Sequence, residues 1–588
     1  MAQSFINRYL PCLEWIRQYD RQTFSHDLVA AIIVTIMLVP QSLAYSMLAG
    51  LPAEVGLYAS IMPLILYALF GSSRTLSVGP VAVASLMTAS AIGSLDLQSP
   101  EEYLQAAVIL AFLSGVFLAL LGLLRFGFLA NFLSHPVVSG FISASGIIIA
   151  LSQIRHIIGI NANGDNVPEI LHTLANNVSS INYTTLQVGL FALVFLFAVK
   201  KWLKQILQRL GLNDFLSGLM IRSAPVMAVI VTIIWAVSGN LAEHGVALVG
   251  EIPSGLPSLT FPALDLSMVR ELWISAVLIS VIGYVESISV GKTLAVKRRQ
   301  RVDQDQELIG LGAANIGSAL SGAFPVTGGF SRSVVNFDAG AKTQAASIMT
   351  AIGIAIATIT LTDVLALLPR ATLAATIIVA VLGLVDFSIL RKTWVYSRSD
   401  FIAVSATLIV TLVEGVEIGV TCGVLASLLL HLYKTSQPHI AEVGKITGTE
   451  HFRNIKRHQV EINPYILTLR IDESLYFANA TIIEDEILKA LSRRNELRHV
   501  ILMCTAVNKI DISALEVLEI INENMRELGL GFHLSEVKGP VMDALEKTDF
   551  LQHLNGRVFL SQYQAYETLV KQEMESIRSD PANQTYQI

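Results

Sequence analysis

The chain has 588 residues, of which 53% are hydrophobic and only 15% charged, and its mean hydropathy is +0.59. This composition lies outside the range of soluble globular proteins and is typical of a polytopic membrane protein. Forty Lys and Arg against 46 Asp and Glu give a net charge of −6. A chain with this net charge has no strongly positive surface to attract nucleic acid, so we expect no nucleic-acid partner.

The first charged segment precedes a long apolar run and does not have the order of a cleavable signal peptide, because Arg8, Glu14, Arg17 and Asp20 are mixed along it. We therefore assign residues 1–25 to a cytoplasmic N-terminal segment and expect the first membrane span to remain in the mature protein.

Apolar runs recur between residues 26 and 435, which we predict to form a transmembrane domain. A membrane helix needs about 20 mostly apolar residues, and runs of that kind, with shorter broken ones, give about fourteen spans. The runs without any charge cover residues 28–53, 55–73, 75–95, 103–124, 126–154, 223–242 and 343–362.

Basic residues gather in a few short connections, which predicts that these connections and both chain termini are cytoplasmic. The clusters are Lys200, Lys201, Lys204 and Arg209; Lys297, Arg298, Arg299 and Arg301; and Arg391, Lys392 and Arg398.

Two spans are interrupted by Gly and Pro: "SVGPVAVASLM" at residues 77–87 and "PVTGGFSRSVVN" at residues 325–336. In secondary transporters, such interruptions in corresponding halves of the chain indicate a binding site at the membrane midplane. Pro80, Gly328 and Gly329 let a helix begin inside the membrane, so its first backbone N–H groups have no intrahelical partner. An anion placed at such an N-terminus satisfies these donors and the positive end of the helix dipole.

Arg332 stands directly after the second interruption, where an intramembrane charge costs about 3 kcal/mol on insertion scales and indicates function. We interpret it as part of a positive pocket, with the hydroxyls of Ser331 and Ser333 as further donors. The alternatives are an ion pair with Asp338 or Glu286, or a side chain that reaches the membrane interface.

Glu286 interrupts the apolar stretch "WISAVLISVIGYVESISVGKTLA" and could carry a coupling proton or bind Na⁺. A static salt bridge to Arg332 or Lys292 is the alternative. Gln41 and Tyr45 share one face of the first span at a spacing of four residues, and they either face the same cavity or join two helices by hydrogen bonds.

Beyond residue 435 the charges become dense. Between residues 442 and 570, short apolar runs such as "YILTLRI" and "HVILMCTA" alternate with helical patterns, which predicts a compact cytoplasmic α/β domain. The polar end of the chain, residues 571–588, is predicted to be a flexible tail.

Three long segments resemble the SulP sulfate permease family, also known as the solute carrier 26 anion transporter family. They are residues 39–87, which begin "VPQSLAYSMLAG", residues 132–147, "FLSHPVVSGFISASGI", and residues 328–344, "GGFSRSVVNFDAGAKTQ". The resemblance implies two inverted seven-span repeats arranged as a core and a gate domain, with Glu286 as the ion-coupling residue. It implies substrate binding by Gln41, Tyr45, Gly79, Val81, Ala82, Phe330, Ser331 and Arg332.

The C-terminal stretch "VILMCTAVNKIDISALEVLEII" resembles the sulfate transporter and anti-sigma factor antagonist (STAS) domain. Ser513 stands where relatives carry a phosphorylatable serine, which makes it a candidate regulatory residue. The sequence also reads as an S-x-x-E capping box of Ser513 and Glu516, and Ile512 and Ala514 depart from the regulators' pattern.

By this resemblance, the expected function is secondary active transport of a small inorganic anion by alternating access, with sulfate first and H⁺ as the coupling ion. Open alternatives are Na⁺-coupled bicarbonate symport, chloride or dicarboxylate transport, and, in another class, a membrane-anchored STAS regulator or sensor. We expect a homodimer surrounded by lipid in a bacterial inner membrane, with a cytoplasmic protein as a candidate STAS partner.

No motif of an enzyme is found: the sequence contains no P-loop, no HExxH and no nucleophile elbow. Its three cysteines, Cys12, Cys422 and Cys504, lack the spacing of a metal site or a disulfide framework. We accordingly expect no enzymatic activity, no metal and no cofactor.

Overall fold

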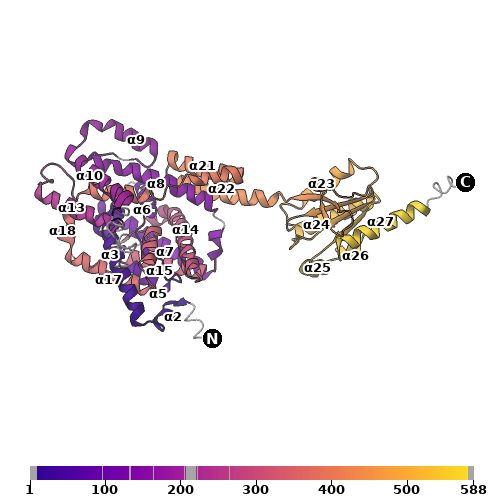
Figure 1. Cartoon of the computed structure of the whole chain (residues 1–588), viewed down its shortest axis with the longest axis horizontal. Helices are drawn as coiled ribbons and strands as arrows, with labels where there is room; N and C mark the ends of the chain where they lie inside the picture. Colours follow the sequence, from indigo (N-terminus) through magenta and orange to yellow (C-terminus); the bar gives the residue numbers. More distant parts are fainter. Residues whose placement is uncertain are drawn as a thin grey trace. The chain divides into compact units, whose positions relative to one another are not determined.

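The structure is a computed structural model that describes residues 9–95, 97, 99–131, 134–162, 164–203, 206, 209, 220, 221, 223–253, 255–263 and 265–579. The chain divides into two compact units, Met1–Leu428 and Leu429–Ile588 (Figure 1). Lys204, from the first predicted basic cluster, lies outside the described residues.

Apolar helices build the first unit, and among the residues that the structure describes seven segments are long and apolar enough to cross a membrane. These are α3 (Arg21–Leu48), α4 with α5 (Ala53–Tyr58 and Met62–Phe70), α7 (Pro100–Leu123), α8 (His135–Ile158), α10 with η3 (Tyr183–Ala198 and Val199–Leu203), α14 (Leu266–Lys297) and α22 (Val416–Ser436). The shorter apolar helices are α6 (Ala82–Gly93), α13 (Ala224–Ser238), α17 (Ala345–Thr360) and α19 (Arg370–Val381). The unit also contains α15 (Gln304–Leu320), α16 (Phe330–Asp338) and α21 (Arg398–Glu414).

Helix packing repeats between the two halves of this unit. In the core, α3 packs on α17 as α14 packs on α7; in the gate, α8 packs on α21 as α10 packs on α19. Helices α3 to α13 therefore form one repeat and α14 to α22 the other. The predicted fold of two repeats with a core and a gate is confirmed.

Two short strands join the repeats at the broken spans. β1 (Val78–Gly79) pairs antiparallel with β2 (Thr327–Gly328), with Val78 opposite Gly328 and Gly79 opposite Thr327. A side chain at Gly328 would place its Cβ 2.8 Å from the Leu76 side chain and 2.9 Å from the Ser287 hydroxyl, so any larger residue would force these neighbours to shift. Because α6 and α16 each begin within three residues of their strand, the pairing brings both helix N-termini together.

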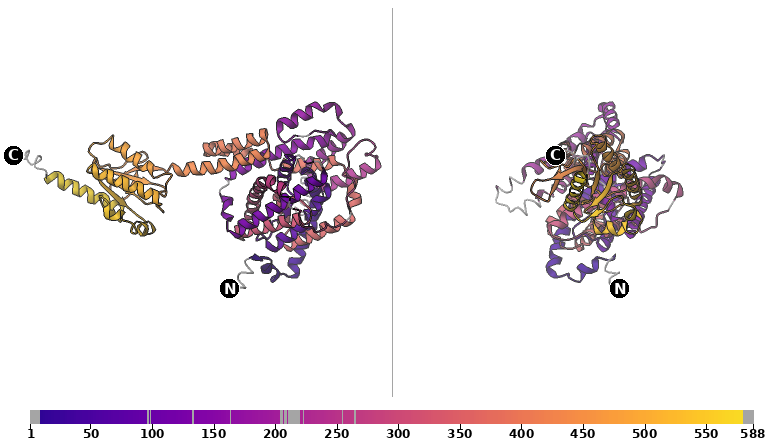
Figure 2. Two further views of the ribbon diagram at one scale, coloured as in Figure 1. Left: turned by 180° about the vertical axis from the view of Figure 1, so that it is seen from behind. Right: turned by 90° about the vertical axis from the view of Figure 1, so that its right-hand side faces the viewer.

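The two faces of the membrane unit are marked by short helices. α2 (Cys12–Ile16) lies beside α5 and places Trp15 in a small apolar cluster with Leu69 and Ala345. α9 (Val167–Asn176) lies at the opposite end of the unit (Figures 1 and 2). α2 precedes α3, the first predicted span, and the cytoplasmic location of this N-terminal segment stays a prediction.

A six-stranded sheet forms the centre of the second unit, in the order β4-β3-β5-β6-β7-β8. The strands from β5 to β8 are parallel, and β3 and β4 are antiparallel. The strands are β3 (Ile440–Lys445), β4 (Phe452–Asn454), β5 (Ile466–Ile471), β6 (His499–Met503), β7 (Gly531–Ser535) and β8 (Val558–Phe559), and the helices are α23 (Thr481–Leu491), α24 (Ile512–Glu527), α25 (Gly539–Leu545), α26 (Phe550–His553) and α27 (Gln562–Ser579).

Alternate residues of β5 serve two separate cores. Leu467 and Leu469 pack in the cluster that contains residues of α23 and α24, whereas Ile466 packs against Leu569 of α27. α27 covers this second face and extends to Ser579. The predicted flexible tail therefore begins too early, since residues 571–579 are helical.

The predicted capping box at Ser513 is wrong. The N-cap of α24 is Asp511, whose carboxylate accepts a hydrogen bond from the backbone N–H of Ala514 at 2.9 Å. Asp511 has the extended backbone that an N-cap requires, and aspartate is among the best N-cap residues, so the helix begins two residues earlier than predicted. Ser513 is the second residue of α24.

Candidate functional site

The first turns of α6 and α16 have no side-chain cap. Their N-cap residues, Val81 and Gly329, are extended and carry no side chain that can accept a hydrogen bond. Several other helices of the unit are capped by side chains, as the N-cap residues Asp20, Ser99, Ser134, Asn182 and Asp265 show. The two half-helices thus keep backbone N–H donors for another acceptor.

Arg332 fastens the two half-helices to each other. Its Nε and Nη2 donate to the carbonyl oxygen of Ser77 at 3.3 and 3.2 Å, and its Nη1 donates to the carbonyl oxygen of Pro80 at 3.1 Å. The side chain is buried, and no carboxylate of the described part of the chain pairs with it. The alternative of an ion pair with Asp338 or Glu286 is therefore wrong. An arginine has five N–H donors, so two remain.

A small cavity of about 50 Å³ lies between these N-termini. Both half-helices contribute to its wall, together with α3, α14 and gate residues next to α19. Its lining residues include Gln41, Tyr45, Pro80, Val81, Ala82, Glu286, Phe330, Ser331 and Arg332. The structure thus brings together nearly all of the predicted substrate-binding residues, although their role stays a prediction.

Gly79 and Ser333 differ from that group. Gly79 does not line the cavity; a Cβ there would lie 3.3 Å from Nη2 of Arg332, so this glycine leaves room for the guanidinium. Ser333 is fully buried, and its hydroxyl accepts a hydrogen bond from the backbone N–H of Ser77 at 2.9 Å. Its interpretation as a donor in the pocket is therefore wrong, because its position at the fourth residue of α16 turns it toward β1.

Glu286 reaches the small cavity from α14. It is 9% exposed, and no described residue donates a hydrogen bond to its carboxylate or forms an ion pair with it. The static salt bridge to Arg332 or Lys292 is therefore wrong. Its neighbour Ser287 bonds the hydroxyl of Thr327 at 2.8 Å and accepts from the backbone N–H of Gly328, which fixes α14 against β2.

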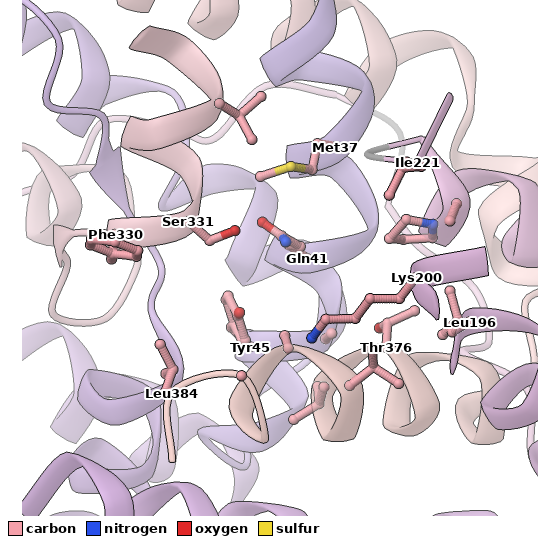
Figure 3. Close-up of a pocket in the computed structure, with 18 of the residues that line it drawn as sticks. Met37, Gln41, Tyr45, Leu196, Lys200, Ile221, Phe330, Ser331, Thr376 and Leu384 are labelled. Carbon is pink, nitrogen blue, oxygen red and sulfur yellow. The ribbon is translucent and has the colours of Figure 1, made fainter. Parts of the chain in front are cut away.

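A larger cavity of about 400 Å³ continues from the small one and shares Gln41, Tyr45, Phe330 and Ser331 with it. Figure 3 shows the side chain of Lys200 extending across this cavity toward Tyr45. Within the described part of the chain, its ammonium group has no hydrogen bond or ion pair. The cavity therefore offers a cation that is not yet neutralised.

Sequence reasoning missed Lys200 as a site residue and placed it only in a cytoplasmic basic cluster. The available signal was its position, as the first cation directly after the apolar run of α10. The reasoning also missed the polar residues that support the loop before β1. The amide of Gln344 donates to the carbonyls of Ser73 and Leu76, and that of Asn336 donates to Thr75.

Comparison with known proteins accounts for this architecture. Residues 24–407 match the Sulfate permease family, and residues 457–565 match the STAS domain. The chain belongs to the sulfate permease family. As a member of this family it is an integral membrane transport protein and not an enzyme.

Relatives of this sulfate permease family member include two plant proteins. The chain is 37% identical to "Sulfate transporter 4.1, chloroplastic" of Arabidopsis thaliana over 88% of its own length and 76% of that protein. It is 30% identical to "High affinity sulfate transporter 2" of Stylosanthes hamata over 94% of its own length and 85% of that protein.

Solved structures share the fold. The murine solute carrier 26 family member A9 anion transporter in the inward-facing state has a TM-score of 0.87 at 23% identity, covering 96% of this chain and 94% of that chain. The transmembrane domain of the cyanobacterium bicarbonate transporter BicA has a TM-score of 0.59 at 21% identity, covering 69% of this chain and 98% of that domain.

Proposed function

We propose that this protein is a secondary active transporter of a small inorganic oxyanion, with sulfate as the first substrate. The observation that carries the proposal is the meeting of two uncapped helix N-termini at one cavity, reinforced by Arg332. The names of the plant relatives, which are sulfate transporters, support the choice of sulfate.

The charges around the cavity suit a dianion. Each helix N-terminus is equivalent to about half a positive charge, so the two half-helices and the Arg332 guanidinium together supply about two. An ionised Glu286 would cancel roughly half of this field, whereas a protonated Glu286 would leave it intact. We infer that sulfate and a proton on Glu286 bind together, which makes H⁺ the coupling ion.

The position of the cavities supports the proposal of alternating access. The core contributes Gln41, Tyr45 and Phe330, and the gate contributes Thr376 and Leu384, so the boundary between the domains passes through the site. A movement of the core past the gate would carry the anion from one side of the membrane to the other. Lys200 is proposed to attract the anion into the larger cavity before it reaches the half-helices.

Uptake of radiolabelled sulfate into proteoliposomes tests this function. We expect saturable uptake that is driven by a pH gradient, acidic on the substrate side, and that persists without Na⁺. Competition by selenate should be strong because selenate has the same shape and charge. Uptake that follows a Na⁺ gradient and prefers bicarbonate would replace the proposal by Na⁺-coupled bicarbonate symport.

A regulatory protein is the alternative from another class. If no anion is transported, including chloride and dicarboxylates, and the STAS domain instead binds a cytoplasmic protein tightly, the membrane unit acts as an anchor or sensor. The predicted homodimer, the cytoplasmic location of both termini, regulation at Ser513 and the bacterial inner membrane remain predictions; the two relatives named above are plant proteins.

A further inference from the structure

We propose that the membrane unit holds a second anion site, which binds a phosphate-bearing ligand next to the N-terminal helix α2. A cavity of about 540 Å³ lies there and shares no lining residue with the two cavities of the transport site. Its walls come from the start of α3, the segment before β1, the C-terminal end of α14 and the connection between α16 and α17.

Cationic side chains dominate the walls of this second cavity. Arg74, Arg298 and Lys342 line it, together with His26. The nearest carboxylate on α3, Asp27, does not line the cavity; it accepts hydrogen bonds from the backbone N–H groups of Lys342 and Thr343 and from the Thr343 hydroxyl. The cavity therefore keeps a positive field that favours an anion.

One of these cationic side chains is held by hydrogen bonds, and the other two have no partner within the described residues. The guanidinium of Arg298 lies 4.4 Å from the ring centre of Phe337 and donates to the carbonyls of Phe337 and Ala341. The side chains of Arg74 and Lys342 have no hydrogen bond or ion pair with any residue that the structure describes. Two free cations can therefore close on a ligand beside a guanidinium that is already held in place.

Trp15 adds a donor of a different kind. Its side chain lines the cavity and is only 8% exposed, and its indole N–H has no acceptor within the described residues. A buried donor without an acceptor costs free energy until an acceptor is supplied. The indole nitrogen itself is fully buried, so a ligand would reach this N–H only after a shift of the Trp15 side chain. The free cations need no such shift to bind a ligand with several acceptor oxygens.

Phosphate is the group that best fits this set of donors. An arginine fork and a lysine ammonium together match a phosphate group in charge and geometry. The cavity is larger than the small cavity of the transport site, and Gln18, Gln22 and Gln300 give it a polar lining suited to a hydroxylated molecule that carries the phosphate. Such a group comes either from a soluble phosphate ester or from a lipid headgroup, because α3 enters the membrane here.

A ligand bound at this site would affect the transport site through the two connections next to the broken spans, one before β1 and one after α16. Arg74 lies in the loop whose carbonyls at Ser73 and Leu76 are held by Gln344, and Lys342 lies two residues before Gln344. A ligand that bridges Arg74 and Lys342 would clamp both connections at once. We infer that its occupancy changes the rate of transport and leaves the choice of substrate unaffected.

The test measures ligand binding to the full-length protein in detergent and in lipid nanodiscs. The probes are inorganic phosphate, glycerol 3-phosphate and nanodiscs with phosphatidic acid, and the readout is the rise in thermal unfolding temperature. The variants are Lys342→Glu and the pair Arg74→Gln with Lys342→Gln. The matched control is Lys292→Gln with Arg301→Gln, which changes two exposed cations that line neither cavity.

We expect at least one probe to stabilise the wild type and the control pair, and both site variants to lose about tenfold or more in affinity. Stabilisation by the two soluble probes identifies a phosphate ester as the source, whereas stabilisation in phosphatidic acid nanodiscs alone identifies a lipid. The proposal is overturned if no probe stabilises the wild type, or if Lys342→Glu binds as the wild type does. An Arg332→Ala variant should retain binding, which separates this site from the transport site.

Discussion

At the residue scale, the charge of Arg332 is compensated inside the membrane by backbone carbonyls rather than by a carboxylate. Its three hydrogen bonds to Ser77 and Pro80 tie α16 to the segment before α6. They leave two N–H groups of a residue that lines the small cavity without these partners. The residue therefore has both a structural and a binding function, which different substitutions can separate.

Replacing Arg332 by lysine should keep the positive charge and lose the planar fork that holds both carbonyls. We expect Arg332→Lys to lower the rate of sulfate uptake and Arg332→Ala to lower it further, by at least about 30-fold, since a hydrogen bond of a charged group contributes about 2 kcal/mol. Uptake by proteoliposomes with matched protein content measures this effect. The exposed Arg301→Ala is the control, and equal activity of all three variants would contradict the assignment.

Glu286 allows a separate test of coupling. Glu286→Gln imitates the protonated carboxyl group, so the variant should still exchange sulfate for sulfate across the membrane but should no longer accumulate it in response to a pH gradient. Counterflow and gradient-driven uptake, measured on the same proteoliposomes, distinguish the two activities. Normal accumulation by this variant would show that the coupling proton is carried elsewhere.

At the element scale, α27 is joined to the STAS sheet by a chain of hydrogen bonds that works only with neutral histidines. The backbone N–H of Arg557 donates to Nδ1 of His533 at 3.0 Å, His533 Nε2 contacts His499 Nδ1 at 3.2 Å, and His499 Nε2 contacts Glu573 at 3.0 Å. Because Nδ1 of His533 is an acceptor, the proton of each neutral ring lies on Nε2. Burial is the main cause that lowers the pKa of His533 to about 4, and the neighbouring His499 and Arg557 add to it.

This arrangement predicts that acid loosens α27. The unfolded state binds a proton on His533 near pH 6.5 and the folded state only near pH 4. Stability is therefore present above about pH 6.5 and is lost as the pH falls toward 4, by roughly 3 kcal/mol in all.

Hydrogen exchange of α27 in the full-length protein measures this loss. Protection should fall between pH 6.5 and pH 4, and His533→Gln should flatten the pH dependence, while the exposed His458→Gln should leave it unchanged. Protection in the wild type that does not vary over this range would refute the role of His533.

The sequence predicted those elements that depend on residues close together in the chain. The breaks before α6 and α16 follow from Pro80, Gly328 and Gly329, and the strands β5 and β6 follow from the short apolar runs that contain them. The start of α24 was predicted wrongly because both Asp511 and Ser513 are good N-cap residues, and only the backbone at Asp511 decides between them. Local patterns do not distinguish such neighbours.

Contacts between distant parts of the chain could not be predicted in this way. Lys200 reaches the cavity of Tyr45 across more than 150 positions of sequence, and Ser333 turns toward Ser77 because β1 and β2 pair in one register. The family resemblance supplied the group of substrate residues, but it did not indicate that Gly79 serves Arg332 rather than the cavity.

At the scale of the whole molecule, every residue assigned to the transport site belongs to the first compact unit. A chain that ends after Ser436 should therefore keep its order of preference among sulfate, selenate, bicarbonate and chloride. We expect its expression level or maximal rate to fall, because the STAS domain is lost. Competition assays on the truncated and full-length proteins compare the preferences, and a changed order in a well-folded truncation would contradict this separation.

The central claim is that the substrate anion lies between the N-termini of α6 and α16. Selenate has the shape and charge of sulfate and carries a strong anomalous scatterer, so crystals of the transporter grown with selenate locate the anion directly. We predict an anomalous peak within hydrogen-bonding distance of the backbone N–H groups of both half-helices and beside Arg332. A protein that transports selenate but shows its only peak outside this cavity would contradict the account.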